Sequence, residues 1–292
     1  MTRPVAVVGL GRMGGGIARR LVAVGQPVTV WNRSADRAAE LASHGATAAE
    51  TPGAATAAAE TVLLAVADAV ALQDVLSGPD GVLSALRPGA TVILLSTVSP
   101  ETVRALEPRV TAAGGRLLEA AMLGNGSHAE QGELRLYLGG DPRVIDQETD
   151  VLGAFAREVT PVGPLGSGMS YKLVLNLLMG LEMQALAEIT ALGEGLGLDR
   201  QQLLSVVAGS GFSAPVMRFK AQRMIRRAYA DPDFRLELMA KDLRLATEEA
   251  TRHDVTIPMT RAATASHREA VEAGLGGLDC AAIADARQGV PA

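Results

Sequence analysis

A glycine-rich segment near the start of the chain has the residue types that hold phosphate groups. Residues 5–21 read as a β-branched run, then glycines at 9, 11 and 14, then a helix-forming stretch. In such a loop the first glycine permits a sharp turn, the second removes a side chain that would block a pyrophosphate, and the third allows close helix packing. The N–H groups that begin the helix face the phosphates. The motif predicts a dinucleotide site formed by Gly9, Leu10, Gly11, Arg12, Met13 and Gly14.

The residues after the second β-type run indicate which dinucleotide binds. A carboxylate at this position would bind the ribose 2′-hydroxyl of NAD, but residues 28–34 read VTVWNRS and contain no acid. Arg33 offers a planar, permanently charged guanidinium to a 2′-phosphate, and Asn32 and Ser34 can add hydrogen bonds. The prediction is NADPH (NADP⁺) rather than NADH. The alternative is that Arg33 is a solvated surface charge and Ser34 only caps the next helix.

A second group of residues that can do chemistry lies in the middle of the chain. Lys172 and Asn176 are four residues apart in a helix-forming stretch, so both project from one helix face. The Lys172 ammonium can donate a proton to a carbonyl oxygen as hydride arrives, and Asn176 can hold the substrate oxygen. Gly168 lies one turn earlier and is expected to leave space for a cofactor or substrate. The alternative for such a pair is a solvated patch, which the neighbouring leucines disfavour.

The first half of the chain has the elements needed to position these groups. Short β-type runs alternate with helical or turn-rich stretches, which predicts βαβ units and a doubly wound, mostly parallel α/β sheet of the Rossmann type. The alanine-rich stretch 51–60 is expected to be a short surface helix. The expected strands are Val5–Gly9, Val28–Asn32, Thr61–Ala65, Thr91–Ser96, Arg116–Ala120 and Leu134–Gly139.

The strand pattern ends near residue 163, and the remainder predicts an all-α domain. We therefore expect a dinucleotide-binding domain over 1–163 and a helical substrate and dimerisation domain over 164–292. The long apolar first helix of the second half favours a homodimer or a higher homo-oligomer. The expected helices are Gly168–Leu196, Asp199–Val207, Pro215–Ala228, Leu236–His253 and Pro258–Ala273, with Asp199 and Asp279 as N-caps.

Composition excludes several classes of protein. The 292 residues are 48% hydrophobic and 20% charged, which is typical of a folded globular chain. A net charge of -5 without a basic stripe argues against nucleic acid as a partner. We expect no membrane association, since no run of eighteen apolar residues and no leader segment stand out. The single cysteine, Cys280, is expected to be a buried filler and favours a cytoplasmic location.

The four histidines do not have the spacing of metal ligands, so no metal site is predicted. They are His44, His128, His253 and His267. Of these, His128 is a candidate for substrate contact because it lies three residues after the segment 119–125, in a loop position. Tyr171 and Phe234 are candidates for lining a substrate pocket, although each is equally consistent with a core position.

Four motifs in order resemble the β-hydroxyacid dehydrogenase family, the relatives of 6-phosphogluconate dehydrogenase that include 3-hydroxyisobutyrate dehydrogenase and the glyoxylate/succinic semialdehyde reductases. The glycine loop resembles the cofactor loop of that family, and residues 96–100 (STVSP) resemble its turn beside the nicotinamide. The run from Gly166 to Asn176 resembles its catalytic helix, and residues 238–243 (LMAKDL) its later helix. The resemblance implies that Lys172 is the acid/base. It adds Ala65, Val66, Thr97 and Lys241 to the cofactor-binding residues.

One segment departs from the family pattern. The family substrate loop runs Asp/Glu-Ala-Pro-Val-Ser-Gly-Gly, whereas residues 119–125 here read EAAMLGN. Leu123 replaces the serine that binds a carboxylate, although the Asn125 amide and backbone N–H groups near Gly124 can still do so. Met122, Leu123, Gly124 and Asn125 are thus the predicted substrate-binding residues. A hydroxyacid, a semialdehyde, or a bulkier aldehyde or ketone is expected as the small-molecule substrate.

Two alternatives remain at this point. Imine reductases share the fold and NADPH use and also have an apolar substrate loop, but their lysine position usually carries another residue. A catalytically silent nucleotide-binding domain would be expected to lack the lysine. The presence of Lys172 therefore favours carbonyl chemistry.

Overall fold

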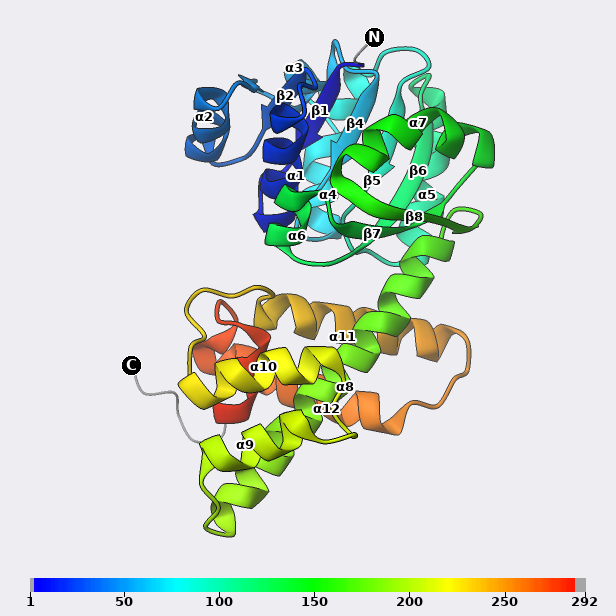
Figure 1. The fold of residues 1–292 in the computed structure, drawn as a ribbon. Helices are drawn as coiled ribbons and strands as arrows, with labels where there is room; N and C mark the ends of the chain where they lie inside the picture. Colours follow the sequence, from blue (N-terminus) through cyan, green and yellow to red (C-terminus); the bar gives the residue numbers. More distant parts are fainter. Residues whose placement is uncertain (1–2, 287–292) are drawn as a thin grey trace. The chain divides into compact units, whose positions relative to one another are not determined.

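The computed structural model describes residues 3–286, which divide into two compact units between Lys172 and Leu173 (Figure 1). This division lies nine residues beyond the boundary predicted from the change in pattern, because the first turn of a long helix packs with the N-terminal unit. The predicted domain limits, 1–163 and 164–292, stay a prediction.

The N-terminal unit contains an eight-stranded sheet in the order β3-β2-β1-β4-β5-β6-β7-β8. Neighbouring strands are parallel except β6 and β7, which are antiparallel. The first six strands have the order found in dinucleotide-binding folds. From β1 the sheet extends through β2 to β3 on one side, and from β4 through β5 to β6 on the other. The predicted α/β class is confirmed. The strands are β1 Val5–Val8, β2 Val28–Trp31, β3 Thr47–Ala48, β4 Thr61–Leu64, β5 Thr91–Leu94, β6 Arg116–Leu123, β7 Leu134–Gly139 and β8 Ala156–Gly163.

Helices cover both faces of this sheet, since alternate strand residues point to opposite sides. Val5 and Val7 face a core shared with α1, α2, α6 and α7, whereas Ala6 and Val8 face a core shared with α3, α4 and α5. Parallel strands buried on both faces explain why their sequences are nearly all apolar. The helices are α1 Arg12–Ala23, α2 Ala35–Ser43, α3 Pro52–Thr56, α4 Ala69–Leu76, η1 Val82–Ser84, α5 Pro100–Ala112, α6 Gly126–Gln131 and α7 Pro142–Phe155.

Two local expectations need correction. The alanine-rich stretch does form a short helix, α3, but it is not a surface helix, because Gly53, Ala55 and Thr56 are buried. Two strands were missed altogether, the two-residue β3 and the longer β8. The sequence of β8, AREVTPVG, carries charges and a proline and is half exposed, as an edge strand can be.

The C-terminal unit is helical, as predicted. Within the described residues its strand-like pairing is limited to an isolated bridge between Arg235 and Asp279. Its core is built from apolar side chains such as Met183, Leu204 and Met239. The long helix α8, Ser167–Gly195, begins in the N-terminal unit and continues into this one. The other elements are α9 Arg200–Gly209, α10 Pro215–Arg226, α11 Leu236–Arg252, α12 Pro258–Ala270, the π-turn η2 Val271–Leu275 and the 3₁₀ turn η3 Cys280–Asp285.

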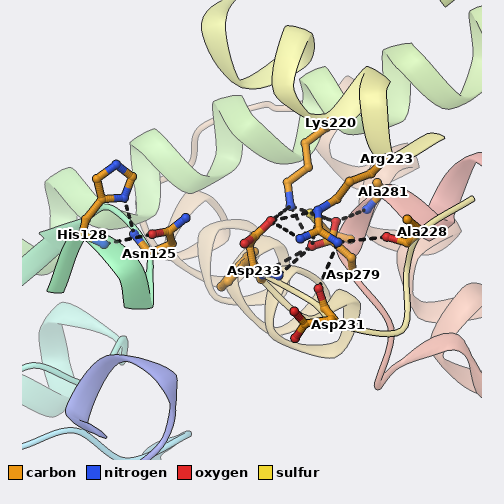
Figure 2. Close-up of polar contacts among 11 residues, drawn as sticks. Asn125, His128, Lys220, Arg223, Ala228, Asp231, Asp233, Asp279 and Ala281 are labelled. Atoms are coloured by element: carbon orange, nitrogen blue, oxygen red, sulfur yellow. Dashed lines mark hydrogen bonds and ion pairs between the residues drawn. The ribbon is translucent and has the colours of Figure 1, made fainter. Parts of the chain in front are cut away.

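A buried ion pair ties η3 to α10. The carboxylate of Asp279 accepts hydrogen bonds from Lys220 Nζ at 2.8 and 2.7 Å and from the N–H of Ala281 at 3.0 Å, which confirms Asp279 as an N-cap. Arg223 bridges Asp233 and the Ala228 carbonyl beside it (Figure 2). Lys220 and Asp279 are 2% and 0% exposed, so the loss of either would leave a buried charge unpaired. This cluster therefore has a structural role.

Buried polar groups next to this cluster are equally well satisfied. Asp285 accepts from Arg200 and from the Tyr229 hydroxyl at 2.6 Å. Burial, with Asp285 alongside, raises the pKa of Tyr229, and burial raises the pKa of Cys280 to about 12. Cys280 is 0% exposed, as expected of a filler residue, and such a thiol is unreactive.

Of the helices within residues 3–286, α8 is the one that is long and apolar enough to cross a membrane. Its most apolar stretch has a mean hydropathy of 1.3. This criterion considers only length and composition. Core helices of water-soluble proteins satisfy it as well, so it is weak evidence taken alone.

His267, on α12, is a buried histidine that makes the stability of the chain sensitive to acid. Its side chain is 0% exposed, its Nδ1–H donates to the Ala263 carbonyl at 2.9 Å, and Nε2 is buried without a partner. Burial lowers the pKa of His267 below its ordinary value. As pH falls below about 6.5, the unfolded chain binds a proton that the folded chain rejects. Folding stability is then lost by about 1.4 kcal/mol per pH unit until the lowered pKa is reached.

We therefore expect His267→Leu to unfold at a higher temperature than the wild type at pH 5, and to differ little at pH 7.5. Thermal unfolding across this pH range measures the difference. The exposed His253 provides the control, since His253→Gln is expected to follow the wild type at every pH. A wild-type acid response in His267→Leu would contradict the assignment.

Candidate functional site

Each of the three glycines of the first loop lacks a side chain for a different geometric reason. Gly9 follows β1 with φ +97°, and a Cβ there would lie 2.5 Å from the Ala65 carbonyl oxygen. A Cβ on Gly14 would overlap the carbonyl oxygen of Gly9. A Cβ on Gly11, by contrast, would meet no protein atom within 4 Å. The space in front of Gly11 is therefore open, and it fits the pyrophosphate for which the motif makes room.

The start of α1 is suited to hold an anion in that space. The helix begins at Arg12 after Gly11, and its first N–H groups have no partner within the helix. The first turn carries no acidic side chain. A diphosphate would thus meet backbone donors and the positive end of the helix dipole without local repulsion.

Two substitutions separate the binding role of this loop from its packing role. Gly11→Ala fills open space, so we expect an unfolding temperature near that of the wild type and nucleotide affinity at least tenfold weaker. Gly14→Ala overpacks the contact with Gly9, which costs about 1–3 kcal/mol, so we expect a clear drop in unfolding temperature. Titration followed by Trp31, the only tryptophan, measures the affinity. Equal destabilisation by both substitutions would contradict this division.

Side-chain hydrogen bonds fix the neighbouring strand ends. Asn32 Oδ1 accepts from the Leu10 N–H at 2.9 Å, and its Nδ2 donates to the Ser34 carbonyl at 3.1 Å. The buried Ser96 hydroxyl accepts from the Val66 N–H at 2.8 Å, which joins the turns after β4 and β5. In this structure Asn32 and Ser96 therefore shape the loops around the cofactor region. Ala65, Val66 and Thr97 are partly exposed on these turns.

The cationic group after β2 is exposed. Arg33 and Ser34 are both accessible, and Ser34 occupies the N-cap position of α2 without a capping bond from its side chain. Arg37 donates to the Leu10 carbonyl at 3.2 Å, so its guanidinium lies beside the glycine loop. Arg33 is thus accessible to a ligand phosphate at the end of β2.

The predicted substrate loop lies at the end of β6 and the start of α6. Asn125 caps α6: its Oδ1 accepts from the His128 N–H, and its own N–H donates to His128 Nδ1, at 3.1 and 3.2 Å (Figure 2). The remaining donor of Asn125 is its Nδ2 group. Gly124 has φ +129°, and Leu123 is partly exposed. The roles of Asn125 and His128 toward substrate stay predictions.

Lys172 contacts this loop directly. Its Nζ donates to the carbonyl of Met122 at 2.7 Å, which brings two predicted site residues together within the N-terminal unit. Beside it, Tyr171 is 51% exposed and stacks on Tyr137 with ring centres 5.8 Å apart. The expectation for Gly168 was wrong. A Cβ there would lie 2.7 Å from the Tyr137 carbonyl oxygen. The missing side chain therefore makes room for the backbone of strand β7 and not for a ligand.

Asn176 and Lys241 lie together in the C-terminal unit. The buried Asn176 donates through Nδ2 to Asp242 Oδ2 at 2.5 Å, and Lys241 Nζ lies 3.2 Å from Asp242 Oδ1. Asp242 is 1% exposed and links the two predicted residues. Phe234 is partly buried against the helical core.

Sequence reasoning missed two carboxylates. Asp242 was read only as part of a motif, and Glu119 only as the first residue of the substrate loop. Glu119 is 0% exposed and accepts three backbone hydrogen bonds from the start of α8. A charged residue among the otherwise apolar residues 117–123 of this strand was the available signal. Within residues 3–286 no group of three His, Cys, Asp or Glu side chains is placed to hold a metal ion.

Comparison with known proteins defines the class of this molecule. Residues 4–163 match the NAD binding domain of 6-phosphogluconate dehydrogenase, and residues 166–286 match the NAD-binding domain of NADP-dependent 3-hydroxyisobutyrate dehydrogenase. The protein is an NAD(P)-dependent oxidoreductase. The chain belongs to the β-hydroxyacid dehydrogenase family, as the four motifs predicted.

Individual relatives agree with this membership. Glyoxylate/succinic semialdehyde reductase 1 of Arabidopsis thaliana is 30% identical over 97% of both chains. A crystal structure of 3-hydroxyisobutyrate dehydrogenase from Salmonella typhimurium matches with a TM-score of 0.89 at 26% identity, over 97% of this chain and 99% of the other. Psf3 in complex with NADP⁺ and 2-OPP gives 0.88 at 28% identity, over 96% and 99%.

Two further proteins are similar to this chain. An imine reductase from Pseudomonas sp. has a TM-score of 0.65 at 24% identity, over 98% of this chain and all of the other, which shows a shared fold alone. The cytokine-like nuclear factor N-PAC of Xenopus tropicalis is 32% identical over 92% of this chain. That match spans 50% of the nuclear factor.

Proposed function

We propose that this chain is an NADPH-dependent reductase of the β-hydroxyacid dehydrogenase type with Lys172 as its acid/base. Hydride would pass between the nicotinamide and the carbonyl carbon of a hydroxyacid, a semialdehyde, or a bulkier aldehyde or ketone. The observation that carries the proposal is the contact between Lys172 Nζ and the Met122 carbonyl, because it holds the ammonium at the predicted substrate loop.

The roles of the chain's own residues follow from their chemistry. The bound cofactor supplies or accepts the hydride. Lys172 donates the proton to the substrate oxygen as negative charge develops there, and it takes the proton back in the reverse direction. Asn176 and Lys241, which share Asp242, are proposed to orient substrate and cofactor. The predicted substrate-binding residues 122–125 and the cofactor-binding residues named from the sequence complete the proposed site.

The use of lysine supports this assignment. The chain contains 27 basic residues, of which only Lys172, Lys220 and Lys241 are lysines. Lys220 is buried in a structural ion pair. The surroundings of an ammonium can bring its pKa toward neutral pH, whereas a guanidinium stays protonated. Lysine is therefore the side chain suited to proton transfer at position 172.

The choice of NADPH rests on the accessible Arg33 and on the absence of acid in residues 28–34. We further propose the domain limits 1–163 and 164–292, a cytoplasmic location, and self-association through the C-terminal unit. Exposed leucines at 178 and 192 on α8, and at 196 directly after it, support the last of these. Analytical ultracentrifugation measures the state of association directly.

Consumption of NADPH by the purified protein tests the proposed chemistry. Three groups of substrates distinguish the possibilities: small keto acids and semialdehydes, uncharged aldehydes and ketones, and cyclic imines. Turnover of either carbonyl group supports the proposal and defines the class. Turnover of imines alone would establish the second candidate, which the apolar Leu123 favours. Nucleotide binding without any turnover would indicate a silent binding domain.

A further inference from the structure

The buried carboxylate of Glu119 holds the beginning of the helix that carries Lys172. Its Oε1 accepts from the N–H groups of Gly166 and Gly168 at 2.5 and 3.0 Å, and its Oε2 accepts from Met169 at 3.0 Å. Donors at a helix start have no partner within the helix, so an external acceptor defines where that helix begins. One strand residue thus fixes the first turn of α8.

The space around this carboxylate is closely fitted. A Cβ on Gly139 would overlap Glu119 Oε1, and a Cβ on Gly168 would lie 3.3 Å from Glu119 Cδ. Burial raises the pKa of Glu119 above its ordinary value, although the three N–H donors and the Arg104 guanidinium act to lower it. Both oxygens of this carboxyl group accept hydrogen bonds from the backbone.

The same strand holds Lys172 at a second point. Met122 lies three residues after Glu119 on β6, and its carbonyl accepts from Lys172 Nζ at 2.7 Å. Lys172 itself lies three residues after Met169 on α8. Strand β6 therefore anchors both the backbone of the first helical turn and the ammonium that the next turn presents.

We propose that Glu119 is a positioning residue for Lys172. By fixing the start of α8 against β6, it sets where the ammonium lies along the substrate loop. This inference rests on the proposed function only in so far as Lys172 is the acid. The anchoring of the lysine is a separate, measurable property.

Replacing the carboxylate with its amide tests the proposal. In Glu119→Gln an NH₂ group replaces one acceptor oxygen, so at least one backbone donor of α8 faces another donor. A displacement of the lysine by about 1 Å is enough to lower turnover by about 10- to 100-fold. We expect that fall in kcat, with NADPH affinity unchanged within about twofold because the glycine loop is untouched.

Glu148→Gln is the matched control. Glu148 is also 0% exposed in the N-terminal unit, but it accepts from Arg3 at 3.0 Å and from Thr61 at 2.7 Å, and both of these partners lie outside α8. Both variants are expected to unfold at a lower temperature, and only Glu119→Gln should lose turnover. If Glu119→Gln fails to fold, Glu119→Asp keeps the charge while shortening the reach, and an intermediate kcat is expected. Equal kcat values for the Glu119 and Glu148 variants, together with an unchanged reactivity of Lys172 toward an amine-reactive reagent, would overturn the proposal.

Chemical labelling separates the anchoring of Lys172 from its catalytic role. With three lysines in the chain and Lys220 buried, an amine-reactive reagent followed by peptide mass analysis reports Lys172 and Lys241 individually. Glu119→Gln is expected to change the labelling rate of Lys172 several-fold relative to Lys241. An unchanged rate would overturn the proposal. A changed rate with wild-type turnover would support the anchoring and overturn the acid role of Lys172.

Discussion

Lys172→Ala is expected to lower kcat by about 10²- to 10⁴-fold, the range that a positioned general acid contributes. The substrate oxygen gains negative charge as hydride arrives, and without the ammonium it has no proton donor at the end of β6. Nucleotide affinity should stay within about twofold, since the glycine loop lies on other elements of the unit. Stopped-flow single turnover gives the chemical rate, and Trp31 titration gives the affinity.

Lys172→Arg divides this effect into its two parts. Arginine keeps the positive charge and the hydrogen-bond donors but does not release its proton near neutral pH. If proton transfer dominates, Lys172→Arg is as slow as Lys172→Ala. If electrostatic stabilisation dominates, much of the rate returns. Wild-type turnover in Lys172→Ala would remove this lysine from the mechanism and favour imine chemistry or another donor.

Much of the cofactor region could be predicted from sequence because its determinants are local. The turn at Gly9, the clearance at Gly11 and the close contact at Gly14 depend on residues within one βα unit. The same holds for the helix that carries Lys172, whose predicted span of 168–196 agrees with the observed 167–195. In such cases periodicity and glycine positions are sufficient.

The parts that could not be predicted depend on pairings between distant residues. Gly168 was read as part of a helix face, yet its lack of a side chain makes room for the carbonyl oxygen of Tyr137, 31 positions away in the sequence. Glu119 contacts residues 47–50 positions further along the chain. No spacing rule within a helix or a strand contains such information. Sequence reasoning found the chemistry-bearing residues but not the groups that hold them in place.

Asn32 shows the same limit within the cofactor region. From sequence it was assigned to a ligand phosphate, together with Arg33 and Ser34. In the structure both of its polar side-chain atoms bond to the backbone of the glycine loop and of Ser34. Of the three residues, Arg33 is the one whose charge is accessible to a ligand.

Arg33→Ala is therefore expected to weaken NADPH binding by about 10- to 100-fold, the equivalent of one charge-assisted pair at about 1.5–3 kcal/mol. NADH lacks the 2′-phosphate, so its affinity should change by less than about threefold. Titration of both nucleotides through Trp31 provides the comparison within one variant. Adenosine 2′,5′-bisphosphate and AMP, used as competitors, test the phosphate contact without the nicotinamide half.

Arg19 and Ser34 provide the controls for this prediction. Arg19→Ala removes a guanidinium already paired with Glu130 at 2.7 Å, so both nucleotides should bind as in the wild type. Ser34→Ala removes a hydroxyl that makes no capping bond to α2, so helix stability should hold while NADPH affinity falls modestly. If Arg33→Ala lost equal affinity for NADPH and NADH, this guanidinium would bind a part of the nucleotide that both cofactors share. NADPH preference would then require another source, of which Arg37, beside the Leu10 carbonyl, is the nearest cation on α2.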